Sequence, residues 1–369
     1  MGGGGWGQLK LALMNEILGR SFFAPTIFGT AAPDTGNAEI LAHFGTEDQK
    51  ATYLQPLMDG DIVSCFSMTE PQAGADPKMF ECAAQKDGDE WILSGEKWFA
   101  SNARWSEFLI VMVVNDPEVS IYRGASMFLL PTNTPGVEFV SNSGMAFEHA
   151  ENRAHAYLRL NDVKLTDADM LGNPGEAFKI AQTRLGGGRV HHAMRTVGLA
   201  KRAFEAICER VQSRSTQGDV LSNKQMVQAE VADLWMEIEQ FRLLVLQTAW
   251  KIDKYNDYKV VKQDIAAAKV LSERVMVSAA RSAIHLHGAL GISNEVLFGE
   301  YLLWGYAVGL ADGPSEVHQI TVAKEALAKV SATDALFPSA HLPSAAEQYK
   351  LKYAASLKLP GHRRGWVDD

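Results

Sequence analysis

Cysteine is scarce in this sequence of 369 residues, which contains only three. Cys65, Cys82 and Cys208 form no close pair, so the sequence offers neither a dithiol redox motif nor a cysteine-based zinc site. The same scarcity argues against the disulfide scaffold of small secreted proteins, and we expect a reducing, intracellular environment. This argument does not distinguish cytoplasm, mitochondrial matrix and peroxisome.

Long apolar runs and an excess of positive charge are also missing. No uninterrupted apolar stretch is long enough to span a bilayer, and the glycine-rich start lacks the basic flank and apolar core of a signal peptide. With 35 Lys and Arg against 44 Asp and Glu, the net charge is −9. We therefore expect a soluble protein that binds neither nucleic acid nor an anionic membrane through its general charge.

Several functional signatures are absent as well. The sequence contains no dinucleotide-binding fingerprint, no phosphate-binding P-loop, no nucleophile elbow and no internal repeat. His191 and His192, like His285 and His287, lack partners at metal-ligand spacing, so no metal site is expected. What is present is ordinary globular composition, with 47% hydrophobic and 21% charged residues, enough for two or three domains.

Hydrophobic periodicity predicts an α+β multidomain chain. Residues 1–63 have the spacing of a short helical segment, and residues 64–172 carry short β-rich runs between turn signals, typical of a barrel or sandwich. Residues 173–330 return to a helical period and predict an antiparallel four-helix bundle, followed by a loosely packed extension, 331–369. The clearest expected helices are 197–211, 227–252 and 260–286, and the clearest strands are 91–95, 108–114, 126–130 and 156–160.

Two segments of the expected β domain carry unusual residues. Thr69, Glu70 and Pro71 precede a turn at Gly74 and Ala75, which indicates a proline-marked strand end where backbone amides could also approach a phosphate. The segment from Gly95 to Asn102 is an aromatic-rich strand that ends in polar residues. Because neighbouring strand side chains point to opposite faces, we expect that Trp98 and Phe99 cannot both face one ligand.

Four segments of the expected bundle can be interpreted either as ordinary helix ends and turns or as parts of a binding site. Gly186, Gly187 and Gly188 before Arg189 cost about 1 kcal/mol each in a helix, so we predict that they interrupt it, either as a helix junction or to admit another group. Residues 214–218 are typical of a solvated helix end, and residues 285–291 end an apolar helix. Asp312, Gly313 and Pro314 form a turn that commonly caps a helix.

Taken together, these segments resemble the acyl-CoA dehydrogenase family. The run from Thr69 to Asp76 resembles the family's first signature, and residues 285–291 resemble the second, with His285 and Ala289 replacing its usual Gln and second Gly. Most members carry a glutamate at the position of Asp312, whereas Asp-Gly-Pro-x-Glu-Val-His resembles the subgroup of family members 10 and 11. Residues 32–37 and 45–50 resemble that subgroup too, and the similarity runs from about residue 20 to 330.

The resemblance implies an FAD cofactor. In the family, the first signature holds the flavin pyrimidine edge, an aromatic residue at the position of Phe99 lies on the ring, and a hydroxyl at the position of Ser101 donates near N5. The loop at Arg214 and Thr216 reaches the partner subunit's FAD across a dimer interface. The implied cofactor-binding residues are Phe66, Met68, Thr69, Gly74, Ala75, Phe99, Ser101, Arg214, Thr216, His285, Gly288, Ala289, Pro314 and Glu316.

The resemblance also implies an activity, the FAD-dependent α,β-dehydrogenation of an acyl-CoA thioester to a trans-2-enoyl-CoA, as in fatty acid β-oxidation. Asp312 would remove the α-proton and flavin N5 would accept the β-hydride. Burial should raise the pKa of Asp312 enough for this task. Gly188, Arg189 and Gly313 would bind the substrate, with Arg189 at the CoA end. A homodimer or homotetramer with shared FAD sites and an electron-accepting flavoprotein partner are expected.

Other functions stay open. Nitroalkane oxidases share this fold and use an aspartate base, and flavin-assisted elimination on a substituted acyl-CoA is another possibility. The family's N-terminal domain normally has several helices before residue 45, so the chain could also be a shortened, inactive paralogue that serves as a binding or dimerisation module. The basic residue that usually precedes the catalytic carboxylate is absent from the segment between Tyr306 and Leu310.

Overall fold

The computed structural model describes residues 4–145, 148–333 and 336–354. They fall into two compact units, one that ends at Val322 and one that begins at Ala323. The boundary lies inside α11 (Ser315–Leu327), and each unit is described by itself. Among the described residues, no helix has the length and apolar character needed to cross a membrane.

The N-terminal part is helical, as its periodicity predicts. Thr46 accepts a hydrogen bond from the Gln49 amide while the Gln49 side chain accepts one from Thr46, and this capping box starts a helix. Ile40 and Leu41 are fully buried against the sheet. The elements are α1 (Gly7–Leu18), α2 (Ala24–Ile27), α3 (Asp34–Phe44), α4 (Glu47–Gln49), a π-helical turn (Lys50–Leu54) and α5 (Gln55–Asp59).

Eight strands of the described chain form one mixed sheet in the order β6-β7-β3-β2-β4-β5-β8, with β1 paired in parallel to β4. Strand β4 is apolar along most of its length because both its faces are covered. Ile110 and Met112 pack toward α3 and α7, while Leu109 and Val111 pack into the other core. The strands are β1 (Ser64–Ser67), β2 (Ala83–Asp87), β3 (Glu90–Ser101), β4 (Phe108–Val114), β5 (Ala125–Pro131), β6 (Val137–Ser143), β7 (His155–Thr166) and β8 (Met170–Leu171).

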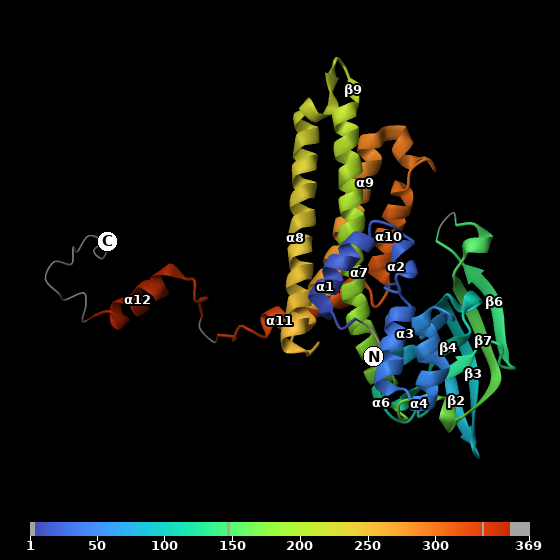
Figure 1. The fold of residues 1–369 in the computed structure, drawn as a ribbon. Coiled ribbons are helices and arrows are strands. Elements are labelled where there is room, and N and C mark those ends of the chain that lie inside the picture. The colour runs from blue at the N-terminus through green and yellow to red at the C-terminus, as the bar shows by residue number, and fades with distance from the viewer. Residues whose placement is uncertain (1–3, 146–147, 334–335, 355–369) are drawn as a thin grey trace. The chain divides into compact units, whose positions relative to one another are not determined.

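The bundle contains α7 (Ala177–Ser213), α8 (Gln225–Tyr255), α9 (Lys262–His287) and α10 (Phe298–Leu310). A hairpin of β9 (Ser215–Thr216) and β10 (Asp219–Val220) joins α7 to α8 at the end far from the sheet (Figure 1). The long helices and the strands predicted from periodicity are confirmed, as is the α+β architecture. Shorter elements are α6 (Ile121–Gly124) and 3₁₀ turns at Pro77–Met79, Ala103–Trp105, Ala150–Asn152, Asp167–Asp169, Leu221–Asn223 and Gly288–Ile292.

Helix α7 belongs to two hydrophobic cores. Its first turns, up to Leu185, pack against the sheet and α3, whereas Val190 and later residues pack inside the bundle. The glycine run lies between these two parts, and the helix continues through it without interruption over 37 residues. The prediction that the glycines interrupt the helix is therefore wrong, because packing on both sides outweighs their low helix propensity.

The unit that begins at Ala323 includes α12 (Leu342–Lys352), which has no buried residue. The sequence predicts a loosely packed extension at 331–369, and α12 is a helix within it. Residues 334–335 and 355–369 of that extension, including Pro360, lie outside the described residues.

Candidate active site

Asp312 lies in the turn between α10 and α11, in a left-handed backbone conformation with φ of 56°. Gly313 follows with φ of 98°, a conformation that glycine adopts readily. Aspartate is one of the few other residues that tolerate a left-handed backbone. The turn leaves only 15% of the Asp312 side chain exposed, so a carboxylate is largely enclosed at this point.

Helix α7 approaches this carboxylate through a residue that has no side chain. A Cβ atom on Gly188 would lie 3.0 Å from Asp312 Oδ2. His192, one turn further along, places Nε2 3.8 Å from the same oxygen. Residues four apart share one face of a helix. The face of α7 that lies toward Asp312 therefore carries Gly188, which has no side chain, and then the imidazole of His192.

The backbone of Asp312 is held from two other directions. Arg189 Nε donates a hydrogen bond to the Asp312 carbonyl oxygen at 3.0 Å. His318 Nε2 of α11 lies 3.2 Å from that same oxygen. These contacts tie the turn to α7 and to α11, and they give Arg189 a structural role in addition to the CoA contact predicted for it.

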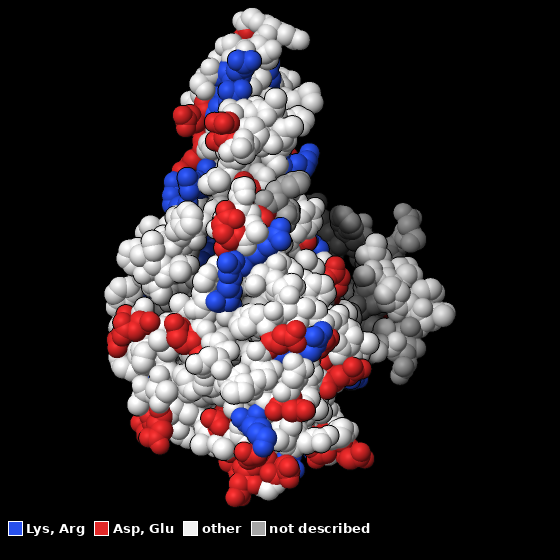
Figure 2. Space-filling model, turned by 90° about the vertical axis from the view of Figure 1, so that its right-hand side faces the viewer, with Lys and Arg blue, Asp and Glu red and all other residues white. Residues whose placement is uncertain are grey.

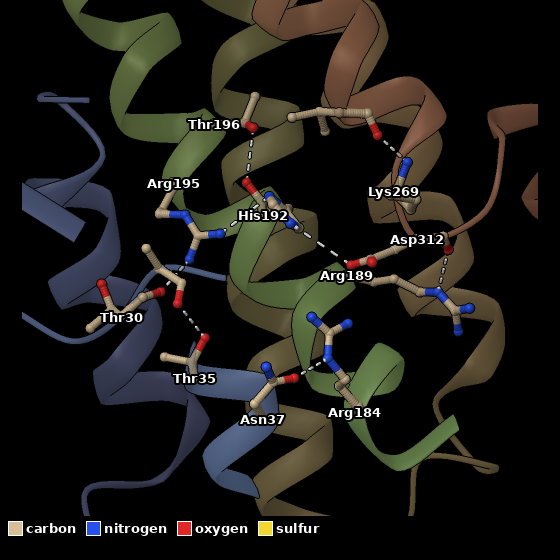
Figure 3. A network of polar contacts seen from close by, with 12 residues as sticks. Thr30, Thr35, Asn37, Arg184, Arg189, His192, Arg195, Thr196, Lys269 and Asp312 are labelled. Carbon is tan, nitrogen blue, oxygen red and sulfur yellow. Dashed lines mark hydrogen bonds and ion pairs between the residues drawn. The ribbon is translucent and has the colours of Figure 1, made fainter. Parts of the chain in front are cut away.

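Three further basic side chains surround the carboxylate, as Figure 3 shows. Arg184 and Arg195 extend from α7, and Lys269 extends from α9. Arg184 also lies over the Phe66 ring, with its guanidinium carbon 4.0 Å from the ring centroid. The three side chains donate hydrogen bonds to uncharged acceptors, namely Asn37 Oδ1, Thr30 O and Val308 O, respectively. Their positive charge is thus available to act on Asp312.

Burial alone would raise the pKa of Asp312, but the positive charges of Arg184, Arg189 and Lys269 act in the opposite direction, and the pKa is lowered. The expectation of a raised pKa is therefore wrong for the chain without ligands. The sequence indicates the burial of Asp312 but not the basic residues that distant segments bring next to it. Since burial and Arg195 lower the pKa of His192 to about 3, this imidazole is neutral near pH 7, and the cations acting on Asp312 are the arginines and Lys269.

The glycine run also admits groups other than Asp312, as the interpretation of a close approach predicted. A Cβ on Gly187 would lie 3.0 Å from Glu39 Oε2 and 3.4 Å from the Tyr258 hydroxyl. Burial raises the pKa of Glu39 to about 7, although the charge of Arg184 lowers it. Gly187 and Gly188 thus make room for two carboxylates and a phenol next to α7.

The predicted first signature and the following aromatic strand are fastened together by a buried ion pair. Glu70 and Lys97 side chains are each 1% exposed, with Nζ 2.7 Å from Oε1. Lys97 also donates to the Met68 carbonyl at 3.0 Å, and the Trp98 amide donates to the Thr69 carbonyl at 2.9 Å. These bonds fix the Thr69 segment next to Trp98.

Trp98 and Phe99 lie on the same side of β3, contrary to the expectation from strand alternation. Their rings stack with centroids 4.8 Å apart and 16° between planes. The register of β3 with β7 shifts between Lys97 and Ala100, and Phe99 has φ of 53°. This bulge turns one side chain back toward its neighbour.

Two observations at this end of the sheet fit a planar ring with a polar edge. Phe99 is 53% exposed beside the stacked Trp98. The Ser67 hydroxyl, two residues before Thr69, is buried without a hydrogen-bond partner among the described residues. An exposed aromatic face can pack against a planar ring, and a buried hydroxyl without a partner can bond a polar group. Gly74 and Ala75 are exposed and leave their backbone accessible.

Ser101, predicted to donate near the flavin, is already engaged. Its Oγ lies 2.9 Å from Nδ1 of His155, a residue that sequence analysis did not select. His155 faces Ser101 directly across the β3–β7 ladder.

The structure does not bring all the predicted cofactor residues to one place. Phe66, Met68, Thr69, Phe99 and Ser101 gather at the sheet. The others on the bundle lie at the end of α7 and α9 far from the sheet (Figure 1); these are Arg214, Thr216, His285, Gly288 and Ala289. Gly288 has φ of 65°, and a Cβ atom at this position would have no other atom within 4 Å, so its backbone is accessible. Pro314 and Glu316 stand beside Asp312, half-buried and exposed, respectively.

Most of the basic residues around Asp312 were not predicted from the sequence. Arg184, Gly188, His192 and Arg195 recur at helical spacing on one face of α7, and polar residues in that pattern within a buried helix were the available signal. Lys269 gave no such signal. On the surface, the face in Figure 2 shows Lys and Arg interspersed with acidic residues, which gather at the end farthest from the bundle tip.

Three family models match successive parts of the chain. They are the N-terminal domain of acyl-CoA dehydrogenase over residues 1–61, the middle domain over 65–163 and the C-terminal domain over 175–327.

Individual relatives agree with these matches. Probable acyl-CoA dehydrogenase FadE2 of Mycobacterium tuberculosis is 38% identical over 330 residues, which cover 88% of this chain and 81% of the relative. Acyl-CoA dehydrogenase family member 11 of Gallus gallus is 37% identical over 86% of this chain, but the chain spans only 41% of that relative's length.

Among solved structures, a putative acyl-CoA dehydrogenase from Mycobacterium abscessus has a TM-score of 0.86 at 37% identity, covering 89% of this chain and 81% of that one. Butyryl-CoA dehydrogenase from Megasphaera elsdenii has a TM-score of 0.79 at 28% identity, covering 88% and 83%.

Proposed function

Because the chain belongs to the acyl-CoA dehydrogenase family, we propose that it catalyses the FAD-dependent α,β-dehydrogenation of an acyl-CoA thioester to a trans-2-enoyl-CoA. In this proposal, Asp312 is the base that removes the α-proton. Gly188, Arg189 and Gly313 lie next to Asp312 and contact the substrate, with Arg189 at the CoA end.

The observation that carries this proposal is the enclosure of the Asp312 carboxylate, whose side chain is only 15% exposed. Its lowered pKa keeps it ionised at neutral pH. From the described part of the chain, its oxygens accept no hydrogen bond, and the nearest ion-pair contact is His192 at 3.8 Å. An enclosed, ionised carboxylate whose lone pairs are not engaged is able to accept a proton from carbon.

Substrate binding must increase the basicity of this carboxylate. A thioester α-carbon is weakly acidic, and a carboxylate with a lowered pKa is a weak base. An acyl chain lying against Asp312 excludes water and disfavours the charged form, which raises the pKa. The hydrogen bond from Arg189 to the Asp312 carbonyl holds the base in position meanwhile.

Bound FAD would supply the two-electron oxidation, taking up the hydride from the β-carbon. Residues of the same chain at the sheet, from Phe66 to Ala75 with Phe99 and Ser101, would hold the ring, and Pro314 and Glu316 would border it. Arg214, Thr216, His285, Gly288 and Ala289 lie too far along the bundle to reach that ring, so in this proposal a second copy supplies them. The assembly is then a homodimer or homotetramer, and reduced enzyme passes its electrons to a flavoprotein.

Stopped-flow absorbance with a panel of acyl-CoAs tests the assignment. The wild-type chain loses its yellow colour on mixing, whereas Asp312→Asn retains FAD and does not bleach. Asp312→Glu, which restores the carboxylate one methylene further out, retains part of the rate. Bleaching by Asp312→Asn at the wild-type rate would eliminate Asp312 as the base.

The lowered pKa of Asp312 favours a second candidate, nitroalkane oxidation, since a weak base suits a more acidic carbon. Peroxide formation with nitroethane, without any response to acyl-CoAs, would establish that function. Loss of a β- or γ-substituent without net flavin reduction would indicate elimination. Failure to bind FAD at all would indicate a non-catalytic binding or dimerisation module.

A further inference from the structure

A row of polar side chains crosses three strands at the edge where the flavin ring is proposed to bind. His155 is the first residue of β7 and stands in direct register with Ser101 of β3 on one side and Ser143 of β6 on the other. Directly opposed residues on neighbouring strands project to the same face. The Trp98 indole donates to the Ser143 hydroxyl at 3.4 Å, so the stacked rings are anchored to this same row.

The central bond of the row is the one between Ser101 and His155. Ser101 Oγ and His155 Nδ1 are 2.9 Å apart. A serine hydroxyl has one hydrogen to donate, while its oxygen accepts up to two hydrogen bonds. If Nδ1 carries the imidazole proton, His155 donates to Oγ and the serine hydrogen is free for another acceptor. With the proton on Nε2, the serine hydrogen is used by His155 instead.

The surroundings keep His155 neutral, so its tautomer matters. Burial lowers the pKa of His155, and Glu148 is the described charged group that opposes this shift. The Phe99 ring lies 6.3 Å from the imidazole, centroid to centroid. A neutral imidazole has one donor nitrogen and one acceptor nitrogen, and the partner of each decides which is which.

We propose that His155 is a positioning residue that donates from Nδ1 to Ser101 Oγ and thereby directs the Ser101 hydrogen toward the acceptor edge of a flavin ring bound against Phe99. This role rests on the proposed function, because it requires a flavin at this edge. His155 does not touch the reacting atoms, and it acts through Ser101. The imidazole and the hydroxyl therefore form one unit.

Four variants of the full-length chain test this unit: Ser101→Ala, His155→Leu, their combination, and His155→Asn. The Asn amide can occupy the place of Nδ1 as a donor, whereas Leu removes the donor and keeps an apolar filling. The readouts are FAD affinity by fluorescence titration and the midpoint potential of the bound flavin, neither of which requires turnover. Thermal unfolding followed by circular dichroism reports folding.

We expect Ser101→Ala and His155→Leu to shift the midpoint potential in the same direction and by the same amount, with no further shift in the double variant. Each should weaken FAD binding by no more than about tenfold, the value of one hydrogen bond. His155→Asn should restore the wild-type potential. A merely structural cross-strand link would alter thermal stability but leave the potential unchanged.

A wild-type potential in His155→Leu, or additive shifts in the double variant, would overturn the proposal. Should His155→Leu not fold, His155→Gln replaces it, because its amide is displaced by one bond from the position of Nδ1. If the wild-type chain takes up no FAD, the proposed function itself fails and this role of His155 falls with it. The two failures are thus distinguishable.

Discussion

Gly188 of α7 lies directly against the carboxylate of Asp312, so that a Cβ atom there would sit 3.0 Å from Oδ2. The two residues belong to different elements, and the absent side chain leaves the space that the carboxylate occupies. Glycine at position 188 makes room for the Asp312 carboxylate, although glycine lowers the stability of the helix.

Gly188→Ala should separate these two effects. We expect the free energy of unfolding to rise by up to about 1 kcal/mol from improved helix propensity, while flavin reduction by acyl-CoA slows because Asp312 is displaced. Gly186→Ala is the matched control, since its added Cβ would meet the Tyr258 ring at an ordinary 3.5 Å. Equal reduction rates in the two variants would contradict the importance of the contact.

Acid should destabilise the protein through its buried histidines. Burial lowers the pKa of His192 to about 3 and those of His191 and His318 to about 4, from 6.5. The unfolded chain thus binds more protons below the ordinary histidine pKa, so stability is complete above it and is lost as pH falls. His192 alone should cost about 3 kcal/mol near pH 4.

Urea unfolding across this pH range checks that expectation. His192→Gln, which cannot titrate, should lose distinctly less stability on acidification than the wild-type chain. If the free energy of unfolding depends on pH in the same way in both proteins, protonation of His192 does not contribute to the acid destabilisation.

The buried pair of Glu70 and Lys97 should be far more sensitive to the loss of one partner than of both. Lys97→Met leaves an unpaired carboxylate that is 1% exposed, and we expect a loss of about 3–5 kcal/mol. The double variant Lys97→Met with Glu70→Gln should recover part of this loss. Urea unfolding of the wild-type chain, the two single variants and the double variant measures the coupling energy between Glu70 and Lys97. If the losses of the single variants add up in the double variant, the two side chains are not coupled.

Shared sites predict complementation between two inactive variants. In the proposed homodimer, Asp312→Asn would damage the site of its own chain, whereas Arg214→Glu would damage the site of its partner. In a mixed dimer, one of the two sites is then intact, so co-expression of the variants should restore about a quarter of wild-type activity from statistical mixing. Activity no higher than that of either variant alone would place Arg214 and Asp312 in the same site.

Periodicity predicted the elements well because each long helix has a continuous apolar face. The predicted helix at 227–252, for example, lies within α8 (Gln225–Tyr255). The prediction that the glycine run interrupts the helix was wrong because helix propensity is a local quantity, whereas packing at both ends stabilises α7.

The candidate site was only partly predictable. Asp312 was identified through its resemblance to known family members, and the structure places it beside Gly188, Arg189 and Gly313. The lowered pKa could not be predicted, since Arg184 and Lys269 come from distant parts of the chain and meet Asp312 only in the fold. The stacking of Trp98 on Phe99 depends on a bulge that strand alternation does not reveal.

The continuity of α7 through both hydrophobic cores has a mechanical consequence. A single helix of 37 residues carries residues that face the sheet and residues that face the bundle, with Gly188 between them. An α-helix is stiff along its axis, so the separation between the two cores is set by a fixed number of turns. A one-residue insertion near its middle would rotate one core against the other by about 100° and disrupt the contacts around Asp312 without replacing any residue that makes them.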